Sequence, residues 1–328
     1  MDKRKLGNLE VSSIGLGCMG FSHAYGEPME ESEAVKAIRS AYDLGYTFFD
    51  TAEVYVGEFK DGRKSVNECL VGKALKDVRH NVQIATKCGI RIAQDKSLIP
   101  DSRPQSIIKA VDNSLRNLGT DYIDLYYQHR PDPNTDPEEV ALTMEHLIDE
   151  GKILHWGISE CSEEYLRRAD AVCHVTAVQM RYSMMARNVE KMFSTLEELG
   201  VGLVAFSPLA NGFLTSGIHY FENRDEKDYR TSMPQYTAEG YEKGKALLSL
   251  LSRMAEEKNS TIAAISLGWM MSKKSYIVPI PGSRKIERIE ENATAADIHL
   301  TDDEILSIDN ALSSMDFLVF GGHGTQKQ

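Results

Sequence analysis

The 328-residue sequence predicts a closed (β/α)8 barrel, an α/β fold of the TIM type. Two observations support this prediction. Eight short apolar runs with strand character alternate with amphipathic helical patterns. In addition, no composition shift and no linker rich in Pro, Gly and Ser divides the chain into halves. We therefore expect a single barrel domain over residues 1–328, with a C-terminal helix and tail after the last strand.

The first expected element is a short β-hairpin that plugs one end of the barrel. Arg4–Leu6 and Leu9–Val11 flank the turn sequence Gly7-Asn8. The barrel strands are expected at Ile14–Gly17, Thr47–Phe49, Val82–Thr86, Ile123–Tyr127, Ile153–Ile158, Thr176–Gln179, Gly202–Phe206 and Ile277–Ile280. The helices are expected near residues 31–44, 65–76, 104–118, 136–150, 162–171, 188–199, 239–257, 261–272, 284–294 and 302–313. Pro and Gly mark the ends of several of them, as Pro104 and Gly119 do for one.

Two segments depart from this alternation. Pro208–Gln235 is a long connection after the seventh strand, and loops of that length are usually functional lids or disordered. The tail Ser314–Gln328 contains the apolar run Phe317-Leu318-Val319-Phe320. Two interpretations of the tail stay open: it docks on the body of the domain, or it folds over the barrel mouth.

The charge balance limits the partners that we expect. The chain has 37 basic and 49 acidic residues, a net charge of −12, whereas nucleic acid and anionic membranes attract a basic surface. We therefore expect a small-molecule partner, no nucleic acid and no membrane. A few local Arg residues would still allow an anionic small molecule. The sequence does not predict the oligomeric state.

The five cysteines show no C-x-x-C spacing, which indicates reduced thiols in a cytoplasmic protein. Cys88 is either a reactive thiol beside a site or, more commonly for such a position, a small packing residue. The N-terminus has no apolar signal-peptide segment, and no stretch approaches the ~20 apolar residues of a membrane helix.

The segment Gly15-Leu16-Gly17-Cys18-Met19-Gly20 satisfies the G-x-G-x-x-G pattern of Rossmann folds. In a Rossmann fold that pattern opens a helix directly. Here a loop follows, and the next helix begins only near Glu31. We therefore expect the glycines to form the first strand-to-helix turn of the barrel.

Titratable residues end three consecutive strands. Asp50, Lys87 and His129 follow the second, third and fourth apolar runs, and Tyr55 lies five residues after Asp50. The carboxyl ends of barrel strands converge on one mouth, where barrel enzymes work. We therefore expect these four side chains, the tetrad, to lie together.

The tetrad suits proton delivery to a carbonyl oxygen. An ammonium beside a Tyr lowers the pKa of its phenol, and a carboxylate holds that ammonium charged. The sequence shows neither a nucleophile elbow nor an H-E-x-x-H metal motif, and we predict no metal site. A hydride-bearing cofactor would supply the missing reactant.

An ordered set of motifs resembles the aldo-keto reductase superfamily over residues 1 to 312. The Asp and Tyr segment is Phe49-Asp50-Thr51-Ala52-Glu53-Val54-Tyr55, and the Lys and His strands are Ile84–Lys87 and Asp121–His129. Further matches are Trp156–Glu160, Val178–Ser183, Phe206–Leu209 with Gly212–Leu214, and Ile280–Arg284 continuing to Arg288, Glu291 and Asn292. The bacterial pyridoxal-reductase-like branch is the most similar in character.

This resemblance implies an NADPH-dependent carbonyl reductase, with NADH as an alternative cofactor. Tyr55 would be the general acid, Lys87 paired with Asp50 would lower its pKa, and His129 would orient the carbonyl. The implied cofactor contacts are Met19, Asp50, Ser159, Gln179, Phe206, Ser207, Pro208, Leu209, Gly212, Leu214, Gly282, Ser283, Arg284, Arg288, Glu291 and Asn292. Ser159 and Gln179 would hold the nicotinamide amide, Phe206 would stack on its ring, and Arg284 would meet a 2′-phosphate. The substrate pocket would draw on Phe21, His23, Tyr25, Phe59, Arg91, Arg130, Phe213 and the tail aromatics.

The sequence departs from the family pattern in three places. Glu160 stands where many members have Asn, and Gly282 where some have Lys. The loop at residues 56–65 is longer than usual. These departures put the amide contact, the preference for NADPH and substrate access in question.

Two other functions stay open. Potassium-channel β subunits resemble the same family, so a nucleotide-binding regulatory subunit with little turnover is one alternative. A metal-dependent barrel hydrolase that uses Asp50 and His129 is the other, although it lacks a ligand set. Arg91 and Arg130, just past strand ends, would favour an anionic or polyhydroxylated carbonyl, or they are ordinary surface charges.

Overall fold

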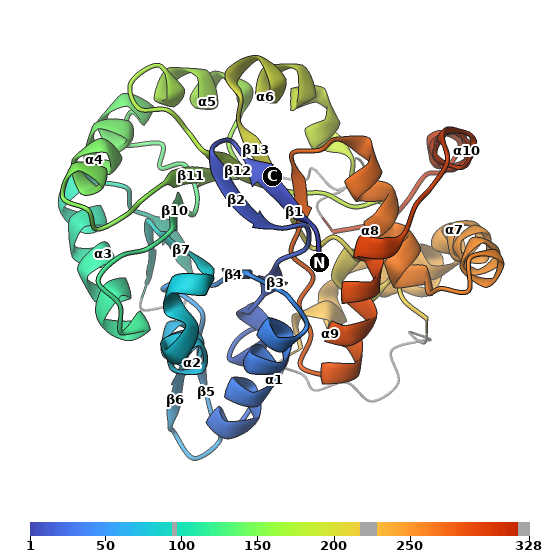
Figure 1. Cartoon of the computed structure of the whole chain (residues 1–328), viewed down its shortest axis with the longest axis horizontal. Coiled ribbons are helices and arrows are strands. Elements are labelled where there is room, and N and C mark those ends of the chain that lie inside the picture. The colour runs from blue at the N-terminus through green and yellow to red at the C-terminus, as the bar shows by residue number, and fades with distance from the viewer. Residues whose placement is uncertain (94–96, 217–227, 321–328) are drawn as a thin grey trace.

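The computed structural model describes residues 1–93, 97–216 and 228–320. Its centre is a sheet of eight parallel strands that pair in chain order: β3 (Leu16–Gly17), β4 (Phe48–Asp50), β7 (Gln83–Cys88), β10 (Leu125–Gln128), β11 (Trp156–Ser159), β12 (Ala177–Arg181), β13 (Gly202–Phe206) and β14 (Ile277–Pro279). The first and last strands close the ring. Gly15 N–H donates to Pro279 O at 2.9 Å, and Gly17 N–H donates to Pro281 O at 3.2 Å. The predicted barrel is therefore confirmed (Figure 1).

Helices surround the barrel (Figure 1). They are α1 (Glu31–Asp43), α2 (Asn67–Leu75), α3 (Pro104–Leu118), α4 (Pro137–Asp149), α5 (Glu163–Asp170), α6 (Phe193–Leu199), α8 (Ile262–Lys273) and α9 (Ile286–Ala293), with α7 (Ala238–Glu257) and α10 (Asp302–Ser313) farther out. Each of the ten predicted helical segments contains one of these helices. The segment 188–199 begins as the 3-10 helix η3 (Asn188–Met192). As predicted, α3 starts at Pro104 and ends before Gly119, which has a left-handed φ of 64°. Within the described part of the chain, no helix is both long and apolar enough to cross a membrane.

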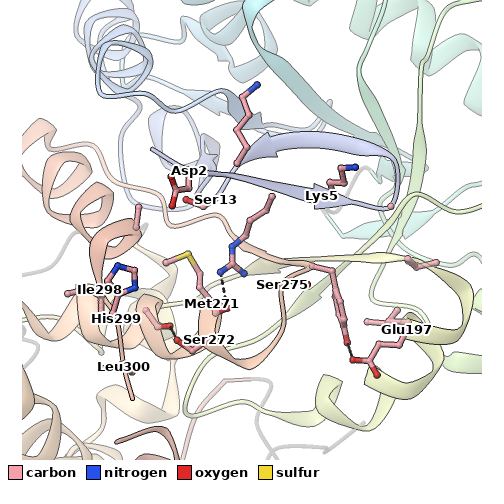
Figure 2. Close-up of a pocket in the computed structure, with 18 of the residues that line it drawn as sticks. Asp2, Lys5, Ser13, Glu197, Met271, Ser272, Ser275, Ile298, His299 and Leu300 are labelled. Carbon is pink, nitrogen blue, oxygen red and sulfur yellow. Dashed lines mark hydrogen bonds between the residues drawn. The ribbon is translucent and has the colours of Figure 1, made fainter. Parts of the chain in front are cut away.

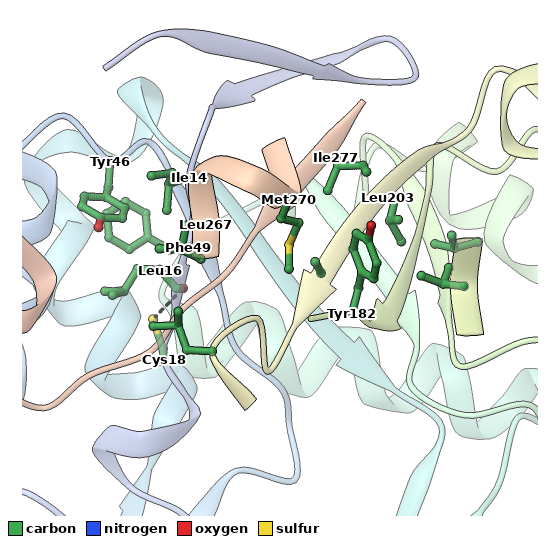
Figure 3. Close-up of a cluster of buried hydrophobic side chains, with 14 of the residues drawn as sticks. Ile14, Leu16, Cys18, Tyr46, Phe49, Tyr182, Leu203, Leu267, Met270 and Ile277 are labelled. Atoms are coloured by element: carbon green, nitrogen blue, oxygen red, sulfur yellow. Dashed lines mark hydrogen bonds between the residues drawn. The ribbon is translucent and has the colours of Figure 1, made fainter. Parts of the chain in front are cut away.

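The core has two layers. The outer layer lies between strands and helices, where Ile14, Leu16 and Phe49 share one apolar cluster with Leu267 and Met270 of α8 (Figure 3). The inner layer fills the barrel, where Phe48, Leu125 and Val204 meet Leu6, Leu9 and Val11 of the N-terminal hairpin. Burial of such side chains contributes about 1.5–3 kcal/mol each. The apolar strand residues thus hold the sheet from both sides.

The N-terminal hairpin consists of β1 (Lys3–Leu6) and β2 (Leu9–Ser12), and its apolar side chains close one end of the barrel as predicted. Gly7 allows the turn to approach the barrel closely. Its φ is +56°, and a Cβ there would lie 3.0 Å from Thr176 O. A larger residue at position 7 would therefore strain the turn and push the hairpin away.

The glycine pattern after the hairpin serves barrel closure. A Cβ at Gly15 would lie 2.6 Å from the Phe48 ring, and a Cβ at Gly17 would lie 2.7 Å from Ile280 O. From the opposite strand, a Cβ at Gly282 would lie 2.5 Å from Gly17 O. A side chain at position 282 would therefore clash with the first strand. This close packing explains why the chain has Gly at this position, where some family members have Lys.

Two hairpins were not predicted. β5 (Val56–Glu58) pairs with β6 (Lys64–Val66) in the long loop after Tyr55, and β8 (Ile90–Ile92) pairs with β9 (Leu98–Pro100). The strands have three residues each, too few for a clear two-residue period. They extend the connections after the second and third barrel strands.

The predicted long connection after the seventh strand contains short 3-10 turns: η4 (Ala210–Gly212), η5 (Tyr229–Ser232) and η6 (Pro234–Tyr236). Its middle part lies outside the described residues. η5 docks on the loop after β3, since Tyr229 N–H donates to Ala24 O at 3.0 Å. The two loops therefore meet over the carboxyl ends of the strands.

The tail packs on the body through its apolar run. Val319 is buried, and Phe320 N–H donates to Gln235 Oε1 at 3.0 Å. The Phe320 ring lies against the guanidinium of Arg181, the last residue of β12. The tail thus reaches the side of the barrel where the strands end, while the rest of the predicted tail lies outside the described residues.

Candidate active site

The Asp50–Lys87 ion pair is the base of the site. Asp50 ends β4, and Lys87 is the penultimate residue of the neighbouring strand β7. Lys87 Nζ lies 2.5 Å from Asp50 Oδ1, and the exposed fractions of the two side chains are 0% and 4%. Lys87 Nζ also donates to Thr51 O at 2.7 Å, and Gln179 Nε2 donates to Asp50 Oδ2 at 2.7 Å. Both charges are therefore paired and hydrogen-bonded, as burial requires.

Tyr55 lies beside this pair, with its hydroxyl 3.4 Å from Lys87 Nζ. Its backbone is held by residues that the sequence did not reveal. Asn67 N–H and Ser22 Oγ both donate to Tyr55 O, at 3.0 Å and 2.9 Å. The fully buried Asn67 also donates to Ser22 Oγ at 2.7 Å. Asn67 is therefore a positioning residue for the tyrosine.

Burial governs the protonation of the tetrad. It raises the pKa of the Tyr55 phenol above its ordinary value, although the Lys87 ammonium opposes the shift. It also raises the pKa of Asp50, against the opposing effects of Lys87 and Gln179. Burial disfavours the Lys87 ammonium, but Asp50 and Tyr55 outweigh it, so the pKa of Lys87 is raised. Lys87 thus acts on the phenol in the predicted direction, but the expected net lowering of the Tyr55 pKa is wrong because burial dominates.

Two histidines flank the Tyr55 ring. His129 follows β10, and its ring meets that of Tyr55 edge-on with centroids 5.9 Å apart. Burial first, and then Lys87 and Arg130, lower the pKa of His129 well below its usual value. His23 stacks on the other side at 6.0 Å, and burial lowers its pKa too. Both imidazoles are therefore neutral near pH 7, and His129 Nδ1 is buried without a partner among the described residues.

Arg130 binds the fifth strand. Its Nη1 donates to His129 O at 2.6 Å and to Ser159 Oγ at 2.9 Å. The neighbouring Glu160 has a left-handed φ of 58°, and its Oε1 accepts from Arg181 N–H at 2.9 Å. Ser159 and Gln179, the two residues predicted to hold the nicotinamide amide, are thus on adjacent strands at the mouth.

The turn after β13 has an unusual backbone. Ser207, Ala210, Asn211 and Gly212 all have positive φ, at 51°, 48°, 61° and 97°. Left-handed conformations cost energy for residues with a Cβ and gather at ligand sites. Successive N–H groups in such turns form concave anion-binding surfaces. The residues predicted to contact the pyrophosphate, Ser207, Pro208, Leu209, Gly212 and Leu214, lie in or beside this turn, where the N–H groups of Ala210, Gly212 and Leu214 donate to backbone carbonyls of the turn itself.

The segment after β14 is held by the arginines predicted to meet adenosine phosphates. Arg284 Nε donates to Gly20 O at 2.5 Å and Nη1 donates to Glu27 O at 2.8 Å, while Nη2 is buried without a partner among the described residues. Arg288 pairs with Glu291, and its Nη2 donates to Ser216 O at 3.0 Å. Arg284 Nη2 and Glu291 Oε1, which have no partner among the described residues, are a donor and an acceptor that a nucleotide could use. Gly282, Ser283 and Asn292 lie in the same segment, beside the turn after β13.

Some of the predicted substrate residues lie beside the tetrad, and others lie away from it. His23 and Arg130 lie beside Tyr55 and His129, and Tyr25 meets Tyr229 at a ring distance of 5.1 Å. Met19, predicted for the cofactor, lies next to them in η1 (Met19–Phe21). Arg91 is exposed on β8, and Phe59 lies under Arg63 at the tip of the β5–β6 hairpin.

Two predicted pocket residues belong to the core instead. Phe21 is 1% exposed, and Phe213 is 2% exposed between Tyr236 and Tyr241. The prediction that Phe21 and Phe213 line the substrate pocket is therefore wrong. Both lie in loops, and neighbouring elements that the sequence does not identify bury them.

Phe206, the predicted nicotinamide-stacking residue, has the guanidinium of Arg181 over its ring at 4.8 Å. The sequence reasoning missed Arg181, although it lies two residues after Gln179 on β12 and so on the same face of the strand. Arg181 and Thr51 therefore join the predicted residues at the mouth.

A cavity of about 790 Å³ lies at the other end of the barrel, around the N-terminal hairpin (Figure 2). Arg4 extends along it and donates to Met271 O, Lys274 O and Ile277 O at 2.9–3.0 Å. These bonds join the hairpin to the carboxyl end of α8 and to the first residue of β14, and the tetrad does not line this cavity. Among the residues that the structure describes, no group of three His, Cys, Asp or Glu is placed to hold a metal ion.

Comparisons with known proteins agree with this geometry. The family model of the Aldo/keto reductase family matches residues 13–313. A probable aldo-keto reductase from Glycine max is 36% identical over 312 residues, which cover 94% of this chain and 88% of the relative. A glycerol dehydrogenase from Gluconobacter oxydans has a similar structure, with a TM-score of 0.84, 26% identity and 96% of both chains covered. The holo form of an aldo-keto reductase from Bacillus halodurans has a TM-score of 0.76 and 29% identity, with 99% of both chains covered.

The matched region contains the barrel, the tetrad and the segments that follow β13 and β14. The chain therefore belongs to the aldo/keto reductase family, and it is an NAD(P)H-dependent oxidoreductase.

Proposed function

We propose that the protein uses NADPH to reduce an aldehyde or ketone to an alcohol, with Tyr55 as the general acid. The observation that carries this proposal is the hydrogen-bonded series from Asp50 through Lys87 to the Tyr55 hydroxyl, with bonds of 2.5 and 3.4 Å. It places a proton donor with a charged neighbour at the end of the barrel where such enzymes work.

The protonation states suit reduction. A raised pKa keeps the Tyr55 hydroxyl protonated at neutral pH, so it holds the proton that a carbonyl oxygen must receive. Lys87 favours the phenolate that remains after the transfer, which lowers the barrier to giving the proton up. Neutral His129 is able to donate one ring N–H to the same oxygen and so orient the carbonyl. Desolvation around these groups strengthens each of these interactions.

A dinucleotide would be held along the ends of three further strands. Ser159 and Gln179 would bind the amide, Phe206 would pack on the ring, and the positive-φ turn at residues 207–212 would receive the pyrophosphate. Arg284 and Arg288 would meet a 2′-phosphate, which favours NADPH over NADH. The bound cofactor supplies the hydride that adds to the carbonyl carbon. Arg284 already binds two loop carbonyls, which supports a moderate rather than strict preference.

The test is Tyr55→Phe. We expect kcat/KM for carbonyl reduction to fall roughly 10²- to 10⁴-fold, the usual contribution of a positioned acid. NADPH affinity, measured by quenching of nucleotide fluorescence, should stay the same, because the ring and its packing are kept. Retention of most activity in Tyr55→Phe would show that the assigned acid is wrong.

The substrate screen should run in both directions, since one structural relative is named a glycerol dehydrogenase. Wild-type protein is assayed with NADPH and NADH against aldehydes, ketones, sugars and pyridoxal, and with the oxidised cofactors against polyols. Tight NADPH binding without turnover in any of these assays would instead favour the regulatory-subunit alternative.

A further inference from the structure

We propose that Arg130 and Arg181 form a subsite for the negative charge of the substrate, so that the preferred carbonyl is an aldehyde carrying a carboxylate or phosphate group. This inference rests on the proposed function and adds the chemical class of the substrate.

Arg181 is a half-buried arginine without an anionic partner. Its guanidinium lies between two aromatic rings, 4.8 Å from the Phe206 centroid and 4.8 Å from the Phe320 centroid. Among the described residues, this guanidinium donates no hydrogen bond and has no carboxylate within ion-pair distance. The nearby Glu160 uses Oε1 to accept from the Arg181 backbone N–H instead. Burial lowers the pKa of Arg181, although the charge of Glu160 opposes the shift.

Arg130 supplies the second charge. Its Nη1 is held by His129 O and Ser159 Oγ, which fixes the side chain across the ends of β10 and β11. No carboxylate of the described residues forms an ion pair with it. Other partly buried arginines do have one: Arg79 pairs with Asp124 at 2.7 Å, and Arg230 with Asp228 at 2.6 Å. Arg4 and Arg284 are also partly buried without a carboxylate, and backbone carbonyls accept from their guanidiniums.

Arg130 lies close to the reacting groups, because it directly follows His129, and its charge helps to lower the pKa of His129 and opposes the rise in the pKa of Tyr55. Arg130 is bonded to Ser159 at the end of β11, and the next residue, Glu160, accepts from the backbone N–H of Arg181 on the neighbouring strand β12. The two arginines therefore lie on either side of the end of β11. An anion between them would accept from the free donors. Arginine binds carboxylate and phosphate oxygens through paired N–H groups, and carboxylates and phosphates share this chemistry.

The phosphates of the cofactor do not account for this pair of charges. The segments proposed to hold these phosphates follow β13 and β14, at residues 207–212 and 284–291. Arg130 follows β10, on the side of the mouth where Tyr55 and His129 lie. We therefore expect the anion that binds these two arginines to be a group of the substrate.

The test compares matched substrates. Succinic semialdehyde and its neutral methyl ester form the carboxylate arm, and glyceraldehyde 3-phosphate and glyceraldehyde form the phosphate arm. Steady-state kcat and KM with NADPH are measured for the wild type, Arg181→Met, Arg130→Met, Arg181→Lys and a control, Arg253→Met, which removes an exposed charge on α7. Circular dichroism and NADPH titration of each variant establish folding and cofactor binding.

We expect the wild type to prefer the charged member of at least one pair. Arg181→Met should raise KM for that charged substrate roughly 10- to 100-fold, as loss of a hydrogen bond to a charged group does. Because Arg181 lies over the Phe206 ring, kcat/KM for the neutral member and NADPH affinity should change far less than KM for the charged member, and Arg181→Lys should restore part of the affinity. Arg130→Met should act in the same direction, with some loss of kcat because Arg130 also holds His129. Arg253→Met should change nothing.

Three outcomes would overturn the subsite. One is a wild type that reduces neutral aldehydes but shows no preference in either pair, which leaves the proposed function intact. Another is an Arg181→Met variant that loses neutral and charged substrates equally, and the third is one that loses NADPH affinity. Absence of turnover with every carbonyl would overturn the proposed function together with the subsite.

Discussion

The environments of Arg4 and Arg181, at opposite ends of the barrel, differ in the hydrogen-bond acceptors that they offer to the guanidinium. At the plugged end, Arg4 donates three hydrogen bonds to backbone carbonyls at the end of α8 and the start of β14, and the apolar hairpin fills the barrel beside it. At the open mouth, Arg181 lies between two aromatic rings without any such acceptor among the described residues. The difference shows that Arg4 serves the stability of the fold, whereas the guanidinium of Arg181 is left with hydrogen-bonding capacity at the open mouth.

Lys87→Met should give the largest effect, because Lys87 both pairs with the buried Asp50 and contacts the Tyr55 hydroxyl. It leaves the Asp50 carboxylate buried and unpaired, so we expect a loss of about 3–5 kcal/mol in the free energy of unfolding. Activity should fall by at least about 10²-fold, since the Tyr55 hydroxyl loses its charged neighbour. Urea unfolding and NADPH-coupled reduction measure the two losses.

The double variant Asp50→Asn with Lys87→Met serves as the control for that substitution. It removes both charges, so it should recover much of the lost stability while activity stays low. If the single and the double variant were equally unstable, the cost would come from packing and not from the unpaired carboxylate.

Arg4→Met should separate the two ends. It removes the three hydrogen bonds that a charged donor makes to carbonyls of α8 and β14, so we expect a loss of about 1.5–3 kcal/mol in the free energy of unfolding. We expect kcat/KM to stay the same, because the residue is at the end of the barrel opposite to Tyr55. Lys3→Met on the same strand is the matched control, since its ion pair with Glu10 is exposed and its loss should not change stability. A drop in kcat/KM for folded Arg4→Met would show that the ends are coupled.

Glu53→Gln should have the smallest effect and the opposite sign. Burial, aided by the neighbouring Glu68, raises the pKa of Glu53 to about 7, whereas an unfolded Glu titrates near 4.3. Between these values the folded protein binds the proton and the unfolded chain does not, so stability falls as the pH rises from 4 to 7.

The Gln variant avoids this penalty. We expect it to be more stable than the wild type by about 1–2 kcal/mol at pH 8 and to show no gain at pH 4.5. Denaturant unfolding at the two pH values measures the difference. An equal difference at both pH values would exclude ionisation of Glu53 as its cause.

Much of this architecture was predictable because its signals are local or periodic. The eight apolar runs predict the strands, and the rule that strand ends converge predicts that Asp50, Lys87 and His129 lie together. The hairpins at residues 56–66 and 90–100 were missed, because strands of three residues show no clear period. Arg181 carried a readable signal, its spacing of two residues from Gln179. Asn67 carried none, since its contacts with Ser22 and Tyr55 depend on the tertiary fold.

Barrel closure has a consequence for synthesis of the protein. The first barrel strand is completed on its outer edge only by Pro279 and Pro281, which emerge from the ribosome near the end of translation. Until then, β3 and β13 are open sheet edges, the kind of surface that pairs with other chains. Contacts between distant parts of a chain also slow folding. The nascent protein should therefore depend on chaperones until its last strand is made, and truncations before β14 should aggregate rather than form a smaller barrel.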